Sequence, residues 1–187
     1  TSANLVKLDT DLSRIYHKYL ENDELEIIFT PNRKVKYIQP ELWINDDGSE
    51  LQEDFEGELY YNDKQYSFFG WIGILKVADT SKTGNAGFSL YKQDRIIVSN
   101  YRPEKLMGGA NLYPYQRIIG DISLDEWPVD FNKGSFTWND GLEDKFIEAL
   151  KKHPIISKYI KQAAELRKRS NATVPKKEDV QAITTKL

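Results

Sequence analysis

A largely apolar run, residues 65–75, constrains this chain more than any other feature of the sequence. It is rich in aromatic and β-branched residues, which favour strands, and so continuous an apolar run is typical of a strand in the middle of a sheet. Residues 55–61 form a second strand-like run, and Asn62-Asp63 between the two predicts a tight turn. We therefore expect a hairpin whose second strand is central. Gly70 within that strand indicates a bulge or the close approach of another backbone.

Further strands are predicted by the same pattern of apolar runs bounded by turn residues. They are residues 25–29 and 35–38, joined by a turn at Pro31-Asn32; residues 87–91 and 95–99, joined by a turn near Gln93-Asp94; and residues 116–124. The segments between the predicted elements are expected to be loops. These are residues 45–54, which are strongly acidic, and residues 78–86, 100–115 and 125–140.

Helices are predicted on either side of these strands. Thr10 is a suitable N-cap, and apolar residues follow it on one helical face. Asp140 and Glu143 have the spacing of a capping box, and Pro154 suits the first turn of a second C-terminal helix. The order helix, strands, helices predicts an α+β fold, with a mainly antiparallel (mixed) sheet, helices on one face and additional C-terminal helices.

The domain organisation follows from where the apolar pattern fades. Residues 1–152 are expected to form one α+β domain and residues 153–170 a C-terminal helix, whereas residues 171–187 read as a disordered tail or linker. The chain starts at Thr1 without methionine and shows no signal peptide, so we expect it to be a piece excised from a longer protein.

Composition excludes several classes of site. The chain has no cysteine, which rules out disulfides, thiol nucleophiles and thiolate metal sites and suits a reducing cytoplasm. Only His17 and His153 carry imidazoles, neither lies in a recognisable catalytic or metal motif, and both are expected to be structural or solvated. No metal site is predicted. No run of about 18 apolar residues is present, so no membrane contact is expected.

The charge of the chain is unevenly distributed. Residues 145–187 hold eleven basic and four acidic residues, a net charge of +7, so the remainder of this chain of net charge −3 carries −10. A basic end on an acidic body predicts either a solvated helix face or a contact with nucleic acid or a partner protein. The cations that would make such a contact are Lys158, Lys161, Arg167, Lys168 and Arg169.

Three segments, in order, resemble the second domain of GHKL-family ATPases, the superfamily of gyrase, MutL, heat-shock chaperones and histidine kinases. Residues 87–97 (Gly-Phe-Ser-Leu-Tyr-Lys-Gln-Asp-Arg-Ile-Ile) are similar to a hairpin of that domain, and residues 116–124 resemble the strand that follows it. Residues 128–133 (Pro-Val-Asp-Phe-Asn-Lys) resemble a loop that precedes a helix. The likeness is to MORC-like and related prokaryotic members, and it extends over roughly residues 10–150.

The resemblance implies a transducer-type domain with a ribosomal-protein-type domain 2-like fold. In such proteins a lysine from the loop after the sheet reaches the γ-phosphate of ATP in the preceding domain. Lys133 matches that lysine, and Asn132 shapes the turn before it. The resemblance also implies ATP with Mg²⁺ in the parent protein, the protein's own N-terminal ATPase domain as partner, and a homodimer of the parent as a further expectation. Because the ATPase motifs themselves are missing from this chain, we expect it to be no enzyme alone and to bind ATP weakly or not at all.

The sequence is compatible with two other functions. The first is a non-enzymatic binding module for sugar, nucleic acid or protein, which would display Trp43, Trp71, Trp127 or Trp138 on one exposed face. The second is a free-standing hydrolase using a carboxylate pair such as Asp121 and Asp125. Since the chain holds 29 acidic residues, such a pair arises readily by chance.

Overall fold

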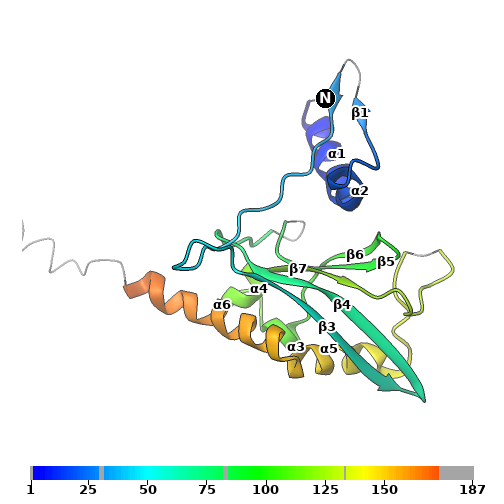
Figure 1. Cartoon of the computed structure of the whole chain (residues 1–187), viewed down its shortest axis with the longest axis vertical. Coiled ribbons are helices and arrows are strands. Elements are labelled where there is room, and N and C mark those ends of the chain that lie inside the picture. Colours follow the sequence, from blue (N-terminus) through cyan, green and yellow to red (C-terminus); the bar gives the residue numbers. More distant parts are fainter. Residues whose placement is uncertain (1, 30–31, 82–83, 133, 173–187) are drawn as a thin grey trace, which may run out of the picture.

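The computed structural model describes residues 2–29, 32–81, 84–132 and 134–172, and it shows an α+β fold with a mixed five-stranded sheet and C-terminal helices (Figure 1). The chain order is α1 (Ser2–Ile15), α2 (His17–Glu21), β1 (Ile28–Phe29), β2 (Arg33–Lys34), β3 (Gln52–Tyr61), β4 (Lys64–Ile74), β5 (Gly87–Lys92), β6 (Arg95–Tyr101), α3 (Glu104–Met107), α4 (Tyr113–Arg117), β7 (Ile118–Ser123), the 3-10 turn η1 (Asn139–Gly141), α5 (Leu142–Lys152) and α6 (Pro154–Ala172).

The five strands lie in the order β3-β4-β7-β5-β6. Neighbouring strands are antiparallel except β5 and β7, which are parallel because the chain passes through α3 and α4 between β6 and β7. Two of the three predicted hairpins form as expected, with Asn62 and Asp63 at the turn of the β3–β4 hairpin and Gln93 and Asp94 at the turn of the β5–β6 hairpin. All four have positive φ, as turns that follow the twist of paired strands require. β4 lies between β3 and β7, which confirms that it is an inner strand.

Glycine lets β4 and β7 approach each other closely. A Cβ atom at Gly70 would lie 1.9 Å from the backbone oxygen of Asp121, and one at Gly120 would lie 2.1 Å from the backbone oxygen of Trp71. The predicted close approach at Gly70 is therefore present. The irregularity of the sheet lies elsewhere, where the β5–β6 register shifts around Leu90.

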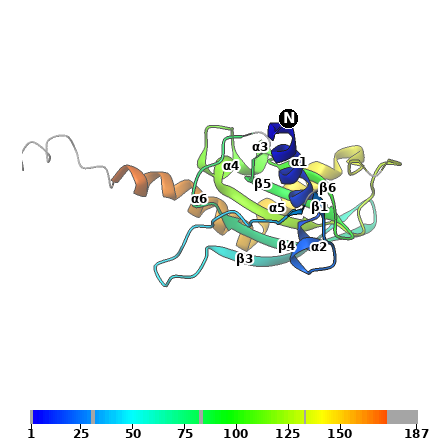
Figure 2. The same cartoon turned by 90° about the horizontal axis from the view of Figure 1, so that it is seen from above.

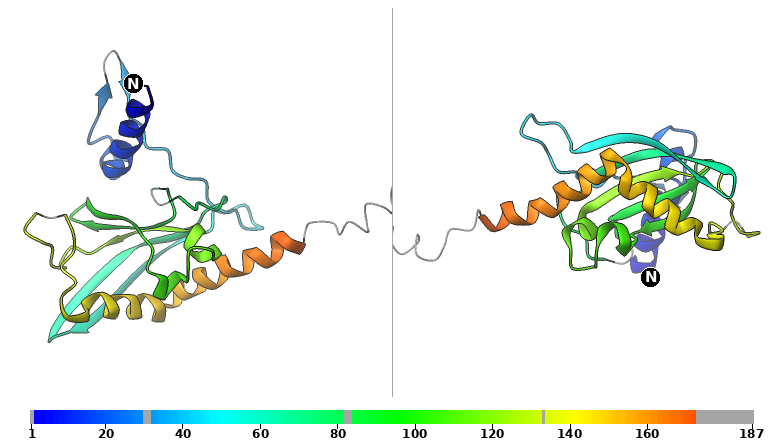
Figure 3. Two further views of the ribbon diagram at one scale, coloured as in Figure 1. Left: turned by 180° about the vertical axis from the view of Figure 1, so that it is seen from behind. Right: turned by 90° about the horizontal axis from the view of Figure 1, so that it is seen from below.

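The C-terminal helices cover one face of the sheet. Alternate residues of β4, Tyr66, Phe68, Ile72 and Ile74, point to this face and are buried, as period-two alternation requires. They share one core with residues of α5 and α6, which cross beneath the sheet in Figures 2 and 3. The contribution of α5 and α6 to this core consists of Leu142, Phe146, Ile147, Leu150, Ile156, Tyr159, Ala163 and Leu166.

Residues 2–37, which we call the N-terminal lobe, lie on the opposite side of the sheet (Figure 1). The lobe consists of α1, α2 and the small sheet of β1 and β2. None of its described residues belongs to either hydrophobic cluster of the protein. An extended segment leads from it to the main sheet, and Ile38 in that segment is 84% exposed. The lobe is thus held to the sheet by a small set of specific contacts rather than by a shared core.

Several predicted element boundaries are wrong. The first helix begins at Ser2 rather than at Thr10, because apolar residues at helical spacing already occur at Leu5 and Leu8, and it breaks at Tyr16. Residues 52–54 of the predicted acidic loop belong to β3. In the N-terminal hairpin, β1 covers only Ile28–Phe29 of the predicted strand 25–29, and β2 lies at Arg33–Lys34, before the predicted strand 35–38, which does not form. The predicted loop 100–115 contains α3 and the start of α4.

The predicted capping box is also wrong. The helix begins at Leu142, so its N-cap is Gly141, which has a φ of 90° and offers no capping side chain. Glu143 instead accepts a hydrogen bond from the Tyr101 hydroxyl at 3.0 Å, so tertiary contact outcompetes the local cap. The predicted start of α6 at Pro154 is confirmed. Most of the expected tail, residues 173–187, lies outside the described residues.

Candidate functional site

The loop between β7 and α5, residues 124–138, folds into a small hairpin. Val129 and Phe136 form an isolated antiparallel bridge. Asp130 closes the tip, since one carboxylate oxygen accepts a hydrogen bond from the backbone N–H of Gly134 at 2.7 Å and the other accepts one from the Ser135 hydroxyl at 3.0 Å. The hydrogen bond from the Gly134 N–H is the main cause that lowers the pKa of Asp130, and the bonds from Ser135 lower it further. The loop therefore has a defined base and a tip closed by one carboxylate.

The base of the loop is anchored in the core. Trp127 is fully buried, and its indole N–H donates to the backbone oxygen of Ser67 on β4 at 2.7 Å. Its ring packs edge-on against Phe146 and Trp138, with centroid distances of 5.0 and 5.9 Å. The ammonium group of Lys92 donates to the backbone oxygens of Asp125 and Trp127 at 2.5 and 2.8 Å. Trp127 and Trp138 therefore act as packing residues, as predicted.

The tip of the loop projects away from this base. Phe131 is fully exposed, with 100% of its surface accessible, and Asn132 and Gly134 are exposed beside it. Lys133, the predicted catalytic and nucleotide-contacting residue, lies outside the described residues, so its role stays a prediction. Asn132, the other predicted nucleotide-binding residue, is thus presented to solvent. Exposure of Phe131 was not predicted, although an aromatic residue two positions before Lys133 is visible in the sequence.

A second polar centre lies between the N-terminal lobe and the open face of the sheet. His17 is 8% exposed, and its Nε2 atom is 3.3 Å from a carboxylate oxygen of Asp121. Its Nδ1 atom is 2.9 Å from the Tyr91 hydroxyl. Trp71 donates its indole N–H to the same Asp121 oxygen at 3.1 Å, and the Tyr37 ring packs against the imidazole with a centroid distance of 4.8 Å.

The electrostatics of this His17 cluster favour the charged imidazole. Burial by itself would lower the pKa of His17, but the hydrogen bond and the charge of Asp121 outweigh it. The Arg14 carbonyl and Glu21 add smaller contributions, and the pKa is raised. Burial raises the pKa of the Tyr91 and Tyr37 hydroxyls, which therefore stay neutral. Both nitrogens of His17 already have partners, so the cluster links the lobe to the sheet and leaves no free ring nitrogen for a general base.

A groove of about 810 Å³ runs beside this cluster along the open face of the sheet. The lobe contributes His17, Lys18 and Glu21 to its lining, and the sheet contributes carboxylates and aromatic rings. The sheet residues on the open face are Asp54, Glu56, Phe69, Trp71, Asp121 and Ser123. Phe55, His153 and Ile155 also line the groove.

The residues predicted for the carboxylate pair and for the aromatic platform do not come together in the structure. Asp121 pairs with His17, whereas Asp125 accepts a hydrogen bond from the backbone N–H of Gln93 at 2.8 Å, so the structure gives the two carboxylates different partners. None of the four tryptophans is exposed, which argues against the predicted stacking platform. Within the described part of the chain, no cluster of histidine and acidic side chains is suited to a metal ion.

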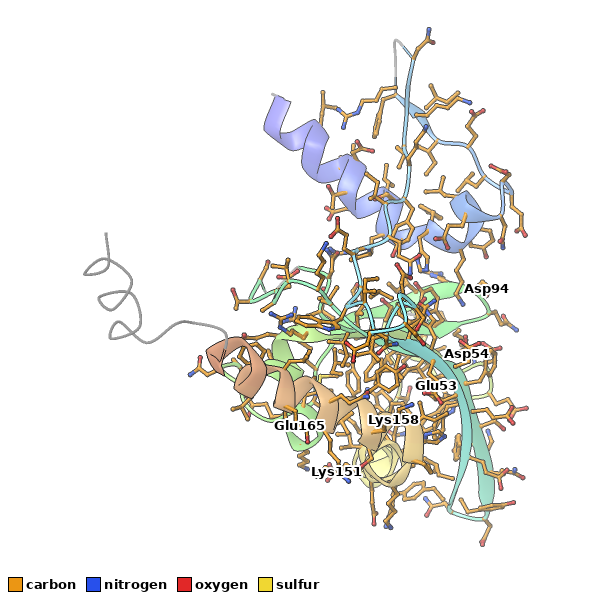
Figure 4. The ribbon with its side chains drawn as sticks, turned by 60° about the vertical axis from the view of Figure 1, so that its left-hand side comes forward. Glu53, Asp54, Asp94, Lys151, Lys158 and Glu165 are labelled. Atoms are coloured by element: carbon orange, nitrogen blue, oxygen red, sulfur yellow. The ribbon has the colours of Figure 1, made fainter. Side chains whose placement is uncertain are left out.

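The basic C-terminal helix is partly neutralised. Lys158 of α6 pairs with Glu53 of β3 at 2.5 Å, as the neighbouring labels in Figure 4 indicate. Lys161 is exposed, and the side chains of Arg167, Lys168 and Arg169 lie outside the described ones. Among the helices described, none is both long and apolar enough to cross a bilayer.

Comparison with known proteins does not identify the function of this chain. No protein family model and no curated protein matches the chain. The function therefore has to be argued from the anchored loop, the His17 cluster and the surfaces of the lobe.

Proposed function

We propose that this chain is the transducer domain of a GHKL-type ATPase, and that it supplies Lys133 to the γ-phosphate of ATP held by a preceding domain. The resemblance of residues 87–97, 116–124 and 128–133 motivates the proposal. The observation that carries it is the architecture of the β7–α5 loop. A base anchored by buried Trp127 presents an exposed tip at Phe131 and Asn132, which directly precede Lys133 in the sequence.

The chemistry needs a cation held in this way. Negative charge grows on the phosphate oxygens as the terminal group is transferred, and a positioned cation stabilises that charge. A loop that is ordered before the nucleotide arrives loses less conformational entropy when the contact forms. The anchoring contacts of Trp127, Lys92 and Asp130 supply such order. ATP and Mg²⁺ would be held by the parent's ATPase domain, in an ATP-rich cytoplasm.

The N-terminal lobe supports the presence of an adjoining domain. Leu5, Leu8 and Ile15 recur at helical spacing on α1 and are all exposed, and Ile28 on β1 is exposed as well. Several exposed apolar side chains on one helix face are unfavourable in water, and such surfaces commonly mark an interface. We assign these residues to the contact with the parent's own ATPase domain. The domain would thereby link nucleotide state to orientation, with homodimerisation and nucleic-acid contact through α6 as further expectations.

The experiment is a kinetic comparison in the parent protein that contains the preceding domain. Lys133→Ala is expected to lower the rate of ATP hydrolysis by about a hundredfold or more, because a single positioned donor at a developing negative charge is worth roughly that factor. Lys133→Arg should recover part of the rate. The matched control is Lys151→Ala, which removes an exposed lysine near the C-terminal end of α5 (Figure 4).

Binding to the isolated chain gives a second readout. Calorimetric titration of the 187-residue chain with Mg-ATP should show no micromolar binding, since the nucleotide pocket belongs to the preceding domain. Equal rates for Lys133→Ala and Lys151→Ala would refute the role of Lys133, and tight ATP binding by the isolated chain would refute the transducer assignment.

A further inference from the structure

The open face of β3, β4 and β7 carries a repeated arrangement of side chains. In one row across the strands, Asp54 is paired with Trp71, and Trp71 with Asp121. In the next row, Glu56 is paired with Phe69 on the neighbouring strand. Each row therefore places an acidic residue of β3 beside an aromatic residue of β4. The two rows are two residues apart along the strands, which corresponds to about 6.7 Å.

The carboxylates of these rows are not neutralised within the described structure. Asp54, Glu56 and Glu21 all line the groove, all are exposed, and none forms an ion pair with a described lysine, arginine or histidine. Lys18, the basic residue at the groove wall, is paired with Asp94 at 3.2 Å. The groove is thus an acidic surface whose own cations are already engaged.

Of the two aromatic residues in the rows, Phe69 is exposed and Trp71 is half-buried. Phe69 is 51% exposed, which is unusual for a phenylalanine in an inner strand. Trp71 is held in place by its hydrogen bond to Asp121, so its ring is oriented before a ligand arrives. A carboxylate beside an aromatic ring suits a lysine or arginine side chain, since the ring face attracts a cation and the alkyl stem covers apolar surface.

We propose that this groove binds an extended, basic peptide segment of a partner protein, in which lysine or arginine alternates with other residues. Alternate side chains of an extended chain lie on one face and recur at about 6.7 Å, which is the spacing of the two rows. One cation would lie between Asp54 and Trp71 and the next between Glu56 and Phe69. A nucleic acid is disfavoured by like charge, and a bare metal ion by the spread of the carboxylates over two rows.

The test uses the full 187-residue chain and a short synthetic peptide in which lysine and threonine alternate. Binding is followed by NMR through the indole N–H signal of Trp71, assigned with Trp71→Phe, and the affinity is measured by calorimetry. A peptide with the same number of lysines at every third position is the comparison, because in an extended chain it places successive lysines on opposite faces. The alternating peptide should bind more tightly and shift the Trp71 signal.

The variant Asp54→Asn with Glu56→Gln should weaken binding of the alternating peptide by about tenfold, as expected for the loss of two exposed charge contacts. The control, Glu104→Gln with Glu165→Gln, changes the net charge equally on exposed residues of α3 and α6 and should leave the affinity unchanged. Equal losses in both double variants, equal binding of both peptides, or no shift of the Trp71 signal would each overturn the proposal. So would a shift caused by protein concentration alone, which would mean that a second copy occupies the groove.

None of these measurements involves nucleotide. The groove proposal therefore stands or fails independently of the role assigned to Lys133.

Discussion

The imidazole of His17 and the carboxylate of Asp121 lie 3.3 Å apart and join the N-terminal lobe to the middle of the main sheet. A second contact lies beside them, where Lys18 pairs with Asp94 and its ammonium group lies 4.1 Å from the centre of the Tyr91 ring. Because the lobe shares no hydrophobic cluster with the sheet, these polar contacts determine how the lobe is placed.

Replacing the carboxylate should reverse the pKa shift of His17. In Asp121→Asn the imidazole stays buried but loses its anionic partner, so burial becomes the dominant influence. We expect the pKa of His17 to fall from above the ordinary value of about 6.5 to below it. An NMR titration of the His17 ring protons measures this change. An unchanged pKa in the variant would show that Asp121 is not the cause of the shift.

Docking of the lobe should depend on pH. Since the pKa of His17 is raised in the folded state, its contribution is complete below the pKa of a free imidazole and is lost as the pH rises through the raised value. The titratable and charged groups that surround the imidazole of His17 are Asp121, Glu21, Tyr91, Tyr37, Arg14 and Lys18.

NMR relaxation of the lobe amides is expected to report more motion at about pH 9 than at about pH 6. In His17→Asn, which cannot titrate, this difference should disappear. A lobe that becomes more rigid as the pH rises would contradict the assignment.

The contact between β4 and β7 should not tolerate a methyl group. In Gly70→Ala the new Cβ atom would lie 1.9 Å from the backbone oxygen of Asp121, so the two strands would have to separate. We expect a loss of about 3 kcal/mol or more in the free energy of unfolding, at the upper end of overpacking effects. Gly109→Ala is the control, because nothing lies within 4 Å of its Cβ position, and its effect should stay within about 0.5 kcal/mol. Urea denaturation measures both, and equal stabilities would contradict the strand packing.

The tip of the β7–α5 loop should depend on one carboxylate. Asp130→Ala removes the acceptor for the Gly134 N–H and for the Ser135 hydroxyl, so residues 130–135 should become mobile on the NMR timescale while the melting temperature barely changes. The pKa of Asp130 is lowered from its ordinary value of 3.8, so this order is complete above that value and is lost as the pH falls through the lowered one. A rigid tip in Asp130→Ala would show that the bridge between Val129 and Phe136 is sufficient.

Much of the sheet was predictable because its information is local. The turns at Asn62-Asp63 and Gln93-Asp94 carry residues that tolerate positive φ, and the flanking runs alternate in the way that a half-buried strand requires. The packing role of Trp127 was predictable for a similar reason, since a tryptophan in a loop next to a predicted helix has a nearby core to enter. The predicted start of the first helix at Thr10 was wrong because the apolar spacing already begins at Leu5, so the local capping preference of Thr10 does not set the helix start.

The His17 cluster was not predictable, because its members are separated along the chain and none lies in a motif. Asp121 and Trp71 become neighbours only through the register between β4 and β7, and Tyr91 joins them only because β5 pairs with β7 in parallel. The helices α3 and α4 were missed because a single turn has little intrinsic stability and forms where tertiary packing supports it.

The sequence by itself determined the α+β class, the hairpins and the C-terminal helices, because periodicity and turn chemistry act between residues a few positions apart. Only the tertiary structure decided that β7 inserts between β4 and β5, that His17 meets Asp121, and that acidic and aromatic side chains alternate across an open sheet face. Those outcomes depend on the register between distant strands, which the free energy of the whole packed sheet selects and no local pattern encodes.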